Sequence, residues 1–241
     1  MHIKKLGASA AYRRECGETV CDGRKLLSEA ASHGIEIKTV LFCGEEPEGL
    51  VAADVCMTPR ELIASASPMV TAQDVLFSCA IPEIGAEEDI AGSCIILENI
   101  QDPGNVGAMI RTANAFSIDT VALVGSCADP FSPKTIRASM GAVFRQKIVR
   151  TDIDGIKRLK NRGVAIYGAA LSERSADIRG VSLENAAVVI GNEGGGLSEE
   201  MLGVCDGEII IPMNADCESL NAGAAAAVIM WEMRRTKSYT G

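Results

Sequence analysis

The sequence of 241 residues offers little material for a histidine-based or metal-based site. Its two histidines, His2 and His33, lie near the start, so a histidine triad would have to use the terminus or one lone side chain. The nine cysteines are scattered without any Cys-x-x-Cys pair, which disfavours zinc and is typical of a reducing cytosol. We therefore expect no metal ion, and thiols that act mostly as small apolar groups.

A long hydrophobic run and an excess of basic charge are also missing. The longest apolar stretch, residues 222–231, is about half of the roughly 20 residues that a membrane helix needs. The start has no apolar segment typical of a secretory signal. The net charge of −9 argues against a protein that coats nucleic acid by bulk electrostatics, so any such contact must be concentrated in a local patch. We expect a soluble, cytoplasmic protein without a membrane partner.

What the sequence does have is an ordinary globular composition, 47% hydrophobic and 23% charged, in two parts. Residues 79–92 interrupt the apolar pattern with Pro82, Gly85 and three consecutive acids. Before this break, residues 22–34 have helical spacing and residues 37–44 form a short apolar run. We expect a small α/β domain over residues 1–85 and a second domain over residues 93–241.

The second part alternates apolar runs of strand length with stretches of helical spacing, such as residues 105–116. The runs cover residues 93–98, 120–125, 164–170, 186–191 and 207–213. Continuous apolar strands that alternate with helices predict a parallel sheet covered on both faces. Ligands of such sheets bind outside the carboxyl ends of the strands, so the loops after these runs are where a site is expected.

The first such loop leads from the buried run into residues 105–116. Asn105 has a simple structural explanation, because asparagine is a favoured N-cap and the Pro-Gly before it is typical of a turn. Arg111 follows six residues later, about 240° round the helix from Asn105 after one full turn. A solvated surface arginine is the alternative to a functional role.

The second loop, residues 191–200, is rich in glycine. It does not fit G-x-G-x-x-G, and no phosphate-binding G-x-x-x-x-G-K-[ST] occurs in the chain. A tight turn into a helix capped by Ser198 would explain the glycines, but it would not explain Glu193.

The third loop, residues 211–223, ends with Ser219 and Asn221 before an alanine-rich helical run. Capping explains one of these polar residues but not both. The run, which includes Val228 and Trp231, is too apolar to face water on all sides, so we expect it to pack against the sheet or another subunit.

Residues 126–150 are basic in an otherwise acidic protein. Their cations are Lys134, Arg137, Arg145, Lys147 and Arg150, and their one acid is Asp129. This reversal of sign predicts an anion-binding patch, with a solvated face as the alternative.

Taken together, the three loops resemble the three motifs of the SpoU (TrmH-like) RNA ribose methyltransferases. The matching residues, in order and spacing, are Asn105, Gly107 and Arg111, then residues 191–198, then residues 211–213 with 218–221. Residues 131–144 are also similar to the segment between the first two motifs. The resemblance implies a parallel α/β sheet whose C-terminal segment forms a trefoil knot. Knots are rare among folds, so the knot rests on the resemblance alone.

The resemblance further implies a homodimer and S-adenosylmethionine as methyl donor. In that family the donor is held largely by backbone groups of the second and third motifs. Transferred to this sequence, the cofactor-binding residues are Gly191, Ile211, Leu220, Met213 and Gly168.

The N-terminal residues 12–30 look like the small substrate-recognition domain that many members carry, although Asp22 stands where glutamate is usual. That likeness favours ribosomal RNA as the substrate, and DNA is not expected. With the basic segment, it predicts RNA contacts by Lys134, Arg137, Arg13 and Arg14.

Arg111 takes the position of the family's proposed catalytic residue, often assigned as a general base. A guanidinium stays protonated in proteins, so we prefer a role in which Arg111 binds the adjacent RNA phosphate and stabilises a developing alkoxide. Asn105, Glu193, Ser219 and Asn221 are then expected to orient Arg111, the ribose and the cofactor.

Three alternatives stay open. The same reaction could act on transfer RNA, or the chain could be a non-catalytic RNA-binding or assembly factor with the same fold. A nucleotide-dependent enzyme with an ordinary doubly wound sheet is the third, and the missing phosphate loops weaken it.

Overall fold

The chain forms two compact units in the computed structural model, which describes residues 2–48, 50–214, 216 and 219–235. The first unit contains Met1–Glu83 and Asp129–Arg145, and the second contains Ile84–Ala128 and Gln146–Gly241. A segment of 17 residues from the middle of the sequence, residues 129–145, therefore packs with the N-terminal part. The single domain boundary expected at residues 79–92 did not predict this placement.

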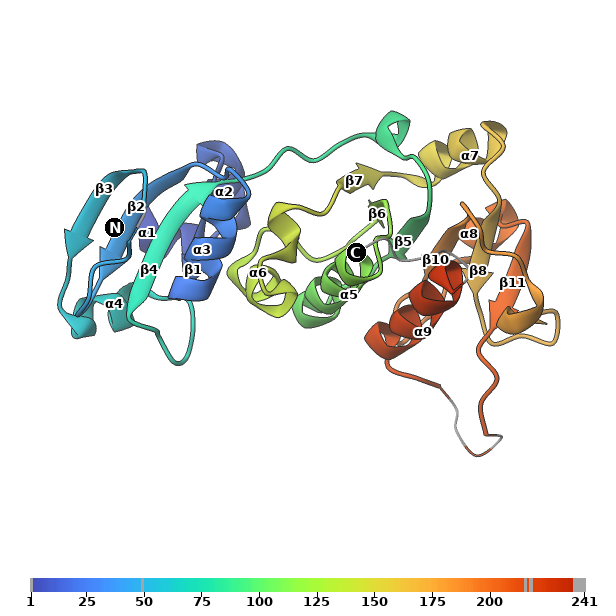
Figure 1. Cartoon of the computed structure of the whole chain (residues 1–241). Helices are drawn as coiled ribbons and strands as arrows, with labels where there is room; N and C mark the ends of the chain where they lie inside the picture. The colour runs from blue at the N-terminus through green and yellow to red at the C-terminus, as the bar shows by residue number, and fades with distance from the viewer. Residues whose placement is uncertain (1, 49, 215, 217–218, 236–241) are drawn as a thin grey trace. The chain divides into compact units, whose positions relative to one another are not determined.

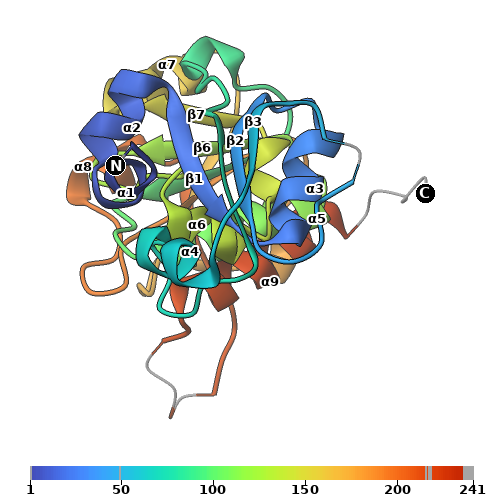
Figure 2. The same cartoon turned by 90° about the vertical axis from the view of Figure 1, so that its left-hand side faces the viewer.

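The N-terminal unit is a four-stranded sheet with helices on both faces (Figure 2). Its elements are α1 (His2–Ala8), α2 (Ala10–Cys16), β1 (Glu18–Asp22), α3 (Arg24–Ser32), β2 (Ile37–Phe42), β3 (Ala52–Met57), α4 (Arg60–Ala66), β4 (Val75–Ala80), α6 (Pro133–Ser139) and the 3-10 turn η2 (Ala142–Phe144). The strand order is β1-β4-β2-β3, and only the β2–β3 pair is parallel. On one face, Leu6 of α1 and Ile63 of α4 pack with Val20 and Leu76. The expected small α/β architecture is present here.

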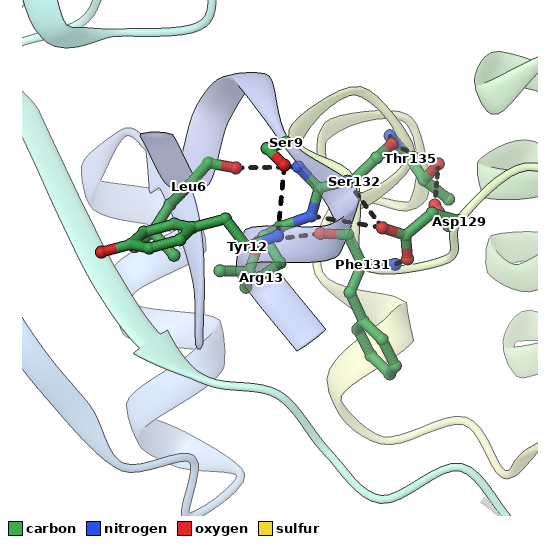
Figure 3. Close-up of polar contacts among 9 residues, drawn as sticks. Leu6, Ser9, Tyr12, Arg13, Asp129, Phe131, Ser132 and Thr135 are labelled. Atoms are coloured by element: carbon green, nitrogen blue, oxygen red, sulfur yellow. Dashed lines mark hydrogen bonds and ion pairs between the residues drawn. The ribbon is translucent and has the colours of Figure 1, made fainter. Parts of the chain in front are cut away.

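The segment 129–145 is held to the N-terminal helices by a buried ion pair (Figure 3). The Arg13 guanidinium donates to Asp129 at 2.6 and 3.2 Å and to the Leu6 carbonyl at 2.8 Å. Thr19 adds a hydrogen bond to the Phe131 carbonyl at 2.7 Å. Arg13 is only 4% exposed, and the structure gives it a buried structural contact that was not expected, while its RNA contact stays a prediction.

The C-terminal unit is a seven-stranded sheet in the order β7-β6-β5-β10-β8-β11-β9, and every strand pair in it is parallel. Its elements are η1 (Glu87–Asp89), β5 (Cys94–Glu98), α5 (Pro103–Ala115), β6 (Thr120–Val124), β7 (Ile148–Thr151), α7 (Ile153–Asn161), β8 (Ile166–Ala169), β9 (Ala176–Asp177), η3 (Ile178–Gly180), β10 (Ala187–Ile190), α8 (Glu199–Val204), β11 (Gly207–Ile210) and α9 (Ala222–Arg234). The five expected apolar runs are β5, β6, β8, β10 and β11. The predicted parallel sheet is confirmed, while the trefoil knot stays a prediction.

The central strands of this sheet are buried and mostly apolar, and helices pack against them. Ile96 and Val189 pack against α7 and α8 through residues such as Ile156 and Met201. Helix α9 contacts α5 and β10, and Figure 1 shows α9 beside α5. Each large aliphatic side chain buried in this way stabilises the fold by about 1.5–3 kcal/mol. This core fixes the carboxyl ends of β5, β8, β10 and β11, where the site lies.

Candidate active site

A cavity of about 450 Å³ opens at the carboxyl ends of three neighbouring strands, β8, β10 and β11. Its walls come from the loops after these strands and from α9, which contributes Ala222, Ala225 and Ile229. This is the position at which ligands bind parallel α/β sheets, and the volume suits a small cofactor.

Four of the five expected cofactor-binding residues line this cavity. They are Gly191, Ile211, Met213 and Leu220. Gly168 is not among the lining residues, and its neighbour Ala169 is. A Cβ atom at Gly168 would lie 2.8 Å from Leu197 and 3.2 Å from Cys205, so this glycine allows packing behind the cavity wall. Burial raises the pKa of the Cys205 thiol to about 11, which makes it a neutral packing group.

Three polar residues of the wall lie outside the three loops that were predicted from the sequence. Ser172 and Arg174 follow β8, and Glu208 lies in β11. The Ser172 hydroxyl donates to Glu208 at 2.5 Å, and Arg174 forms an ion pair with the same carboxylate at 3.0 Å. Residues 170–175 form no recognisable motif, and the only available signal was their position directly after a strand.

The glycine-rich turn folds back tightly on itself. Asn192 and Gly196 exchange two backbone hydrogen bonds, at 3.0 and 2.8 Å. A Cβ atom at Gly191 would lie 2.3 Å from the carbonyl of Gly196 and 2.6 Å from the nitrogen of Leu197, so only glycine fits there. Ser198 caps α8 by accepting from the Met201 N–H at 3.1 Å, as the structural explanation of this turn predicted.

One residue from each of the three loops meets at a polar cluster beside the cavity. Asn105 Nδ2 donates to the Glu193 carboxylate, and Asn221 Nδ2 donates to Asn105 Oδ1 at 3.5 Å. Glu193 and Ser219 also line the cavity. The loops that were expected at strand ends therefore come together in space, although residues 215, 217 and 218 of the third loop lie outside the described residues.

Asn105 does not cap α5, because the helix begins two residues earlier than expected. Asp102 is the N-cap, and its carboxylate accepts from the Asn105 N–H at 2.8 Å. Pro103 then occupies the first helical turn, where proline is favoured. The Asn105 side chain is thereby left for the polar cluster. Asn221 is both a helix cap and a member of the polar cluster. Its Oδ1 caps α9, while its Nδ2 donates to Asn105.

Arg111 lies exposed on the third turn of α5. Within the described part of the chain it makes no hydrogen bond or ion pair, so Asn105, Glu193 and Asn221 do not hold its guanidinium directly. A cation without a partner is available to an anionic ligand.

The other expected RNA contacts lie in the N-terminal unit. Lys134 and Arg137 are exposed on α6, Arg14 is exposed on α2, and none of the three forms an ion pair with another described residue. Arg145, by contrast, is engaged by Glu29 at 2.6 Å.

The fold and the cavity together define an α/β enzyme that binds a small cofactor at the carboxyl edge of a parallel sheet. Residues 92–231 match the model of the SpoU rRNA Methylase family. The chain belongs to this family.

Two curated relatives and one solved structure show the extent of the similarity. The chain is 30% identical to a 23S rRNA (guanosine(2553)-2'-O)-methyltransferase of Bacillus subtilis, over 97% of the chain and 93% of the relative. It is 28% identical to a 23S rRNA (uridine(2479)-2'-O)-methyltransferase of Streptomyces viridochromogenes, over 93% and 85%. The crystal structure of an AdoMet-bound rRNA methyltransferase from Sinorhizobium meliloti superposes with a TM-score of 0.86 at 27% identity, over 99% of this chain and 94% of that one. Similarity therefore extends over both units.

No described helix has the length and hydropathy required to cross a membrane.

Proposed function

We propose that this chain transfers a methyl group from S-adenosylmethionine to a ribose 2'-hydroxyl of ribosomal RNA. The observation that carries the proposal is that the cluster of Asn105, Glu193 and Asn221 lies beside a cavity that Gly191, Gly195 and Gly196 help to line. The chain in which they meet belongs to the SpoU rRNA methylase family. Two relatives, both 23S rRNA 2'-O-methyltransferases, support the reaction and the substrate class. Because one of these relatives modifies a guanosine and the other a uridine, the family alone does not fix the target nucleotide.

The residues of the cavity fit the cofactor. Gly191, Ile211 and Leu220 line the cavity, and their peptide N–H and C=O groups are the groups that would pair with a small polar ligand. Leu197 and Ile229 provide apolar walls that exclude water. When bound, S-adenosylmethionine supplies an electrophilic methyl group on a sulfonium.

The polar cluster and Arg111 would act on the ribose. A 2'-hydroxyl is a weak nucleophile until its oxygen is oriented and its proton leaves. Asn105 and Asn221 present amide groups that can fix the hydroxyl, and Glu193 carries the only group of these three that can accept a proton. Arg111 would bind the neighbouring phosphate and stabilise negative charge on the oxygen.

Purified protein, S-adenosylmethionine with a labelled methyl group, and unmodified RNA test the proposal. Transfer to ribosomal RNA but not to transfer RNA is the expected result. Transfer to transfer RNA alone would favour the alternative substrate, and transfer to neither would favour a non-catalytic RNA-binding protein. We further propose a cytoplasmic location, to which the eight free cysteines among the described residues are suited.

Replacing Lys134 and Arg137 together with alanine is expected to weaken RNA binding and its salt dependence. For every phosphate that the variant no longer neutralises, the slope of log K against log salt should fall by about 1. Filter binding over a series of salt concentrations measures this slope. The double replacement of Lys157 and Arg158, which pair with Asp154 and Glu87, removes the same charge elsewhere and should leave the slope unchanged. An unaltered slope in the first variant would contradict the basic patch.

We also propose that the protein is a homodimer that uses α9. Val228 is 41% exposed and Trp231 is 51% exposed on this helix, and Trp231 stacks edge-on against Phe116 at 5.7 Å. Apolar groups gathered on an exposed helix are typical of an interface. Light scattering should give twice the chain mass of 25.3 kDa, and Trp231→Glu should shift the value toward the monomer. A wild-type mass of one chain at micromolar concentration would argue against the dimer.

A further inference from the structure

Glu98 is a buried carboxylate that the proposed chemistry does not use. It ends β5, the strand from which the first motif leads into α5, and it is only 2% exposed. No described lysine, arginine or histidine forms an ion pair with it. Burying a carboxylate without a counter-charge is unfavourable unless strong donors satisfy it, so its retention needs a reason.

Both oxygens of Glu98 are bound by one residue of the glycine-rich turn. The Ser198 N–H donates to Oε2 at 3.0 Å, and the Ser198 hydroxyl donates to Oε1 at 2.6 Å. The same hydroxyl accepts from the Met201 N–H, so Ser198 connects Glu98 to the first turn of α8. Charge-assisted hydrogen bonds of this kind are stronger than neutral ones and fix geometry.

The other end of the turn is attached to the residue next to Glu98. Asn192 Nδ2 donates to the Asn99 carbonyl at 3.0 Å, and Asn192 Oδ1 accepts from the N–H groups of Gly194 and Gly195. Residues 98 and 99 thus hold residues 192 and 198, the two ends of a turn that contains Glu193. The turn cannot shift without breaking one of these attachments.

We propose that Glu98 and Ser198 are a positioning pair that sets the turn 191–198, and through it the glycine wall of the cofactor cavity and the contact of Glu193 with Asn105. This inference rests on the proposed function, because it takes the cavity to be the S-adenosylmethionine site. Neither residue lies in the polar cluster, and Glu98 does not line the cavity. The pair therefore acts through Gly191 and Glu193.

Calorimetric titration with S-adenosylmethionine, without RNA, tests the pair. Glu98→Ala and Ser198→Ala are each expected to raise the cofactor Kd roughly tenfold to a hundredfold. Glu98→Ala removes the acceptor of both hydrogen bonds, and Ser198→Ala removes the hydroxyl that donates the shorter one. Glu98→Gln keeps one acceptor oxygen, so its Kd for the cofactor should lie between those of the wild type and Glu98→Ala. The double variant should bind little more weakly than the weaker single variant, since both replacements break the same interaction.

Controls separate positioning from a loss of folding. Glu199→Gln removes a neighbouring exposed carboxylate of α8 and should bind the cofactor like wild type. RNA affinity without cofactor should change less than about twofold in every variant, because the cations proposed to bind RNA lie elsewhere in the protein. A purely structural role would lower the melting temperature while the folded protein kept its wild-type Kd, and that result would overturn the inference.

If Glu98→Ala does not fold, the cofactor Kd values of Ser198→Ala and Glu98→Gln still test the positioning pair, since each variant alters one group. A wild-type Kd in both variants would overturn the positioning pair while leaving the proposed function intact. Failure of the wild-type protein itself to bind S-adenosylmethionine would instead overturn the proposed function, and this inference with it.

Discussion

Arg111→Ala is expected to lower the rate of methyl transfer about 10²- to 10³-fold while the Kd for S-adenosylmethionine stays within about twofold of wild type. The reason is geometric and electrostatic. Arg111 lies exposed on α5, has no partner among the described residues and is absent from the cavity wall. It can therefore stabilise charge on the reacting oxygen without holding the cofactor. Single-turnover assays with RNA, together with calorimetric titration of the cofactor, measure the two quantities.

Two further variants make this test specific. Arg111→Lys keeps the charge but loses the planar fork that binds a phosphate through two parallel hydrogen bonds, so it should recover only part of the rate. Arg158→Ala removes an exposed arginine whose partner is Glu87, and it should leave the rate unchanged. Wild-type turnover by Arg111→Ala would remove this residue from the mechanism.

Asp129→Ala is expected to destabilise the N-terminal unit by about 3 kcal/mol, because it leaves the Arg13 guanidinium buried without its carboxylate. The arginine side chain is 5% exposed and that of Asp129 is 25% exposed, so water can compensate only on the aspartate side. The Leu6 carbonyl would remain as an acceptor but carries no full charge. Differential scanning calorimetry measures the destabilisation as a lower unfolding temperature.

The neighbouring arginine provides a matched control for the ion pair. Arg14 is exposed and unpaired among the described residues, so Arg14→Ala should change the free energy of unfolding by no more than about 0.5 kcal/mol. Equal effects of Asp129→Ala and Arg14→Ala would show that the buried pair does not hold residues 129–145 in place.

The parallel sheet could be predicted because its central strands are continuous apolar runs. The edge strands β7 and β9 could not, since β7 is four residues long with an exposed Arg150 and β9 has only two residues. Apolar periodicity reports burial, and edge strands are not buried on both faces.

The local sequence pattern also does not predict where residues 129–145 pack. Arg13 and Asp129 are separated by 116 positions, and two adjacent arginines give no sign of which one is buried. The basic segment predicts one patch, whereas the structure assigns Lys134 and Arg137 to the N-terminal unit and Lys147 and Arg150 to the other. Long-range pairing of charges decides this, and a single sequence does not contain it.

The convergence of the three loops was predictable, because carboxyl ends of parallel strands share one edge of the sheet. The roles of single residues in these loops were harder to predict. Asparagine at position 105 is compatible with an N-cap, yet Asp102 followed by Pro103 is the stronger signal for a helix start. Glu98 and Ser198 are 100 positions apart, so their contact is visible only in the structure.

Alkaline hydrolysis of RNA methylated by the purified protein tests the central claim most directly. A methyl group on the 2'-oxygen prevents that oxygen from attacking the adjacent phosphate, so the linkage survives alkali. With labelled S-adenosylmethionine and unmodified ribosomal RNA, we expect the label in alkali-resistant dinucleotides. Label confined to free mononucleotides, as a base methylation would give, or no incorporation at all, would contradict ribose methylation by this chain.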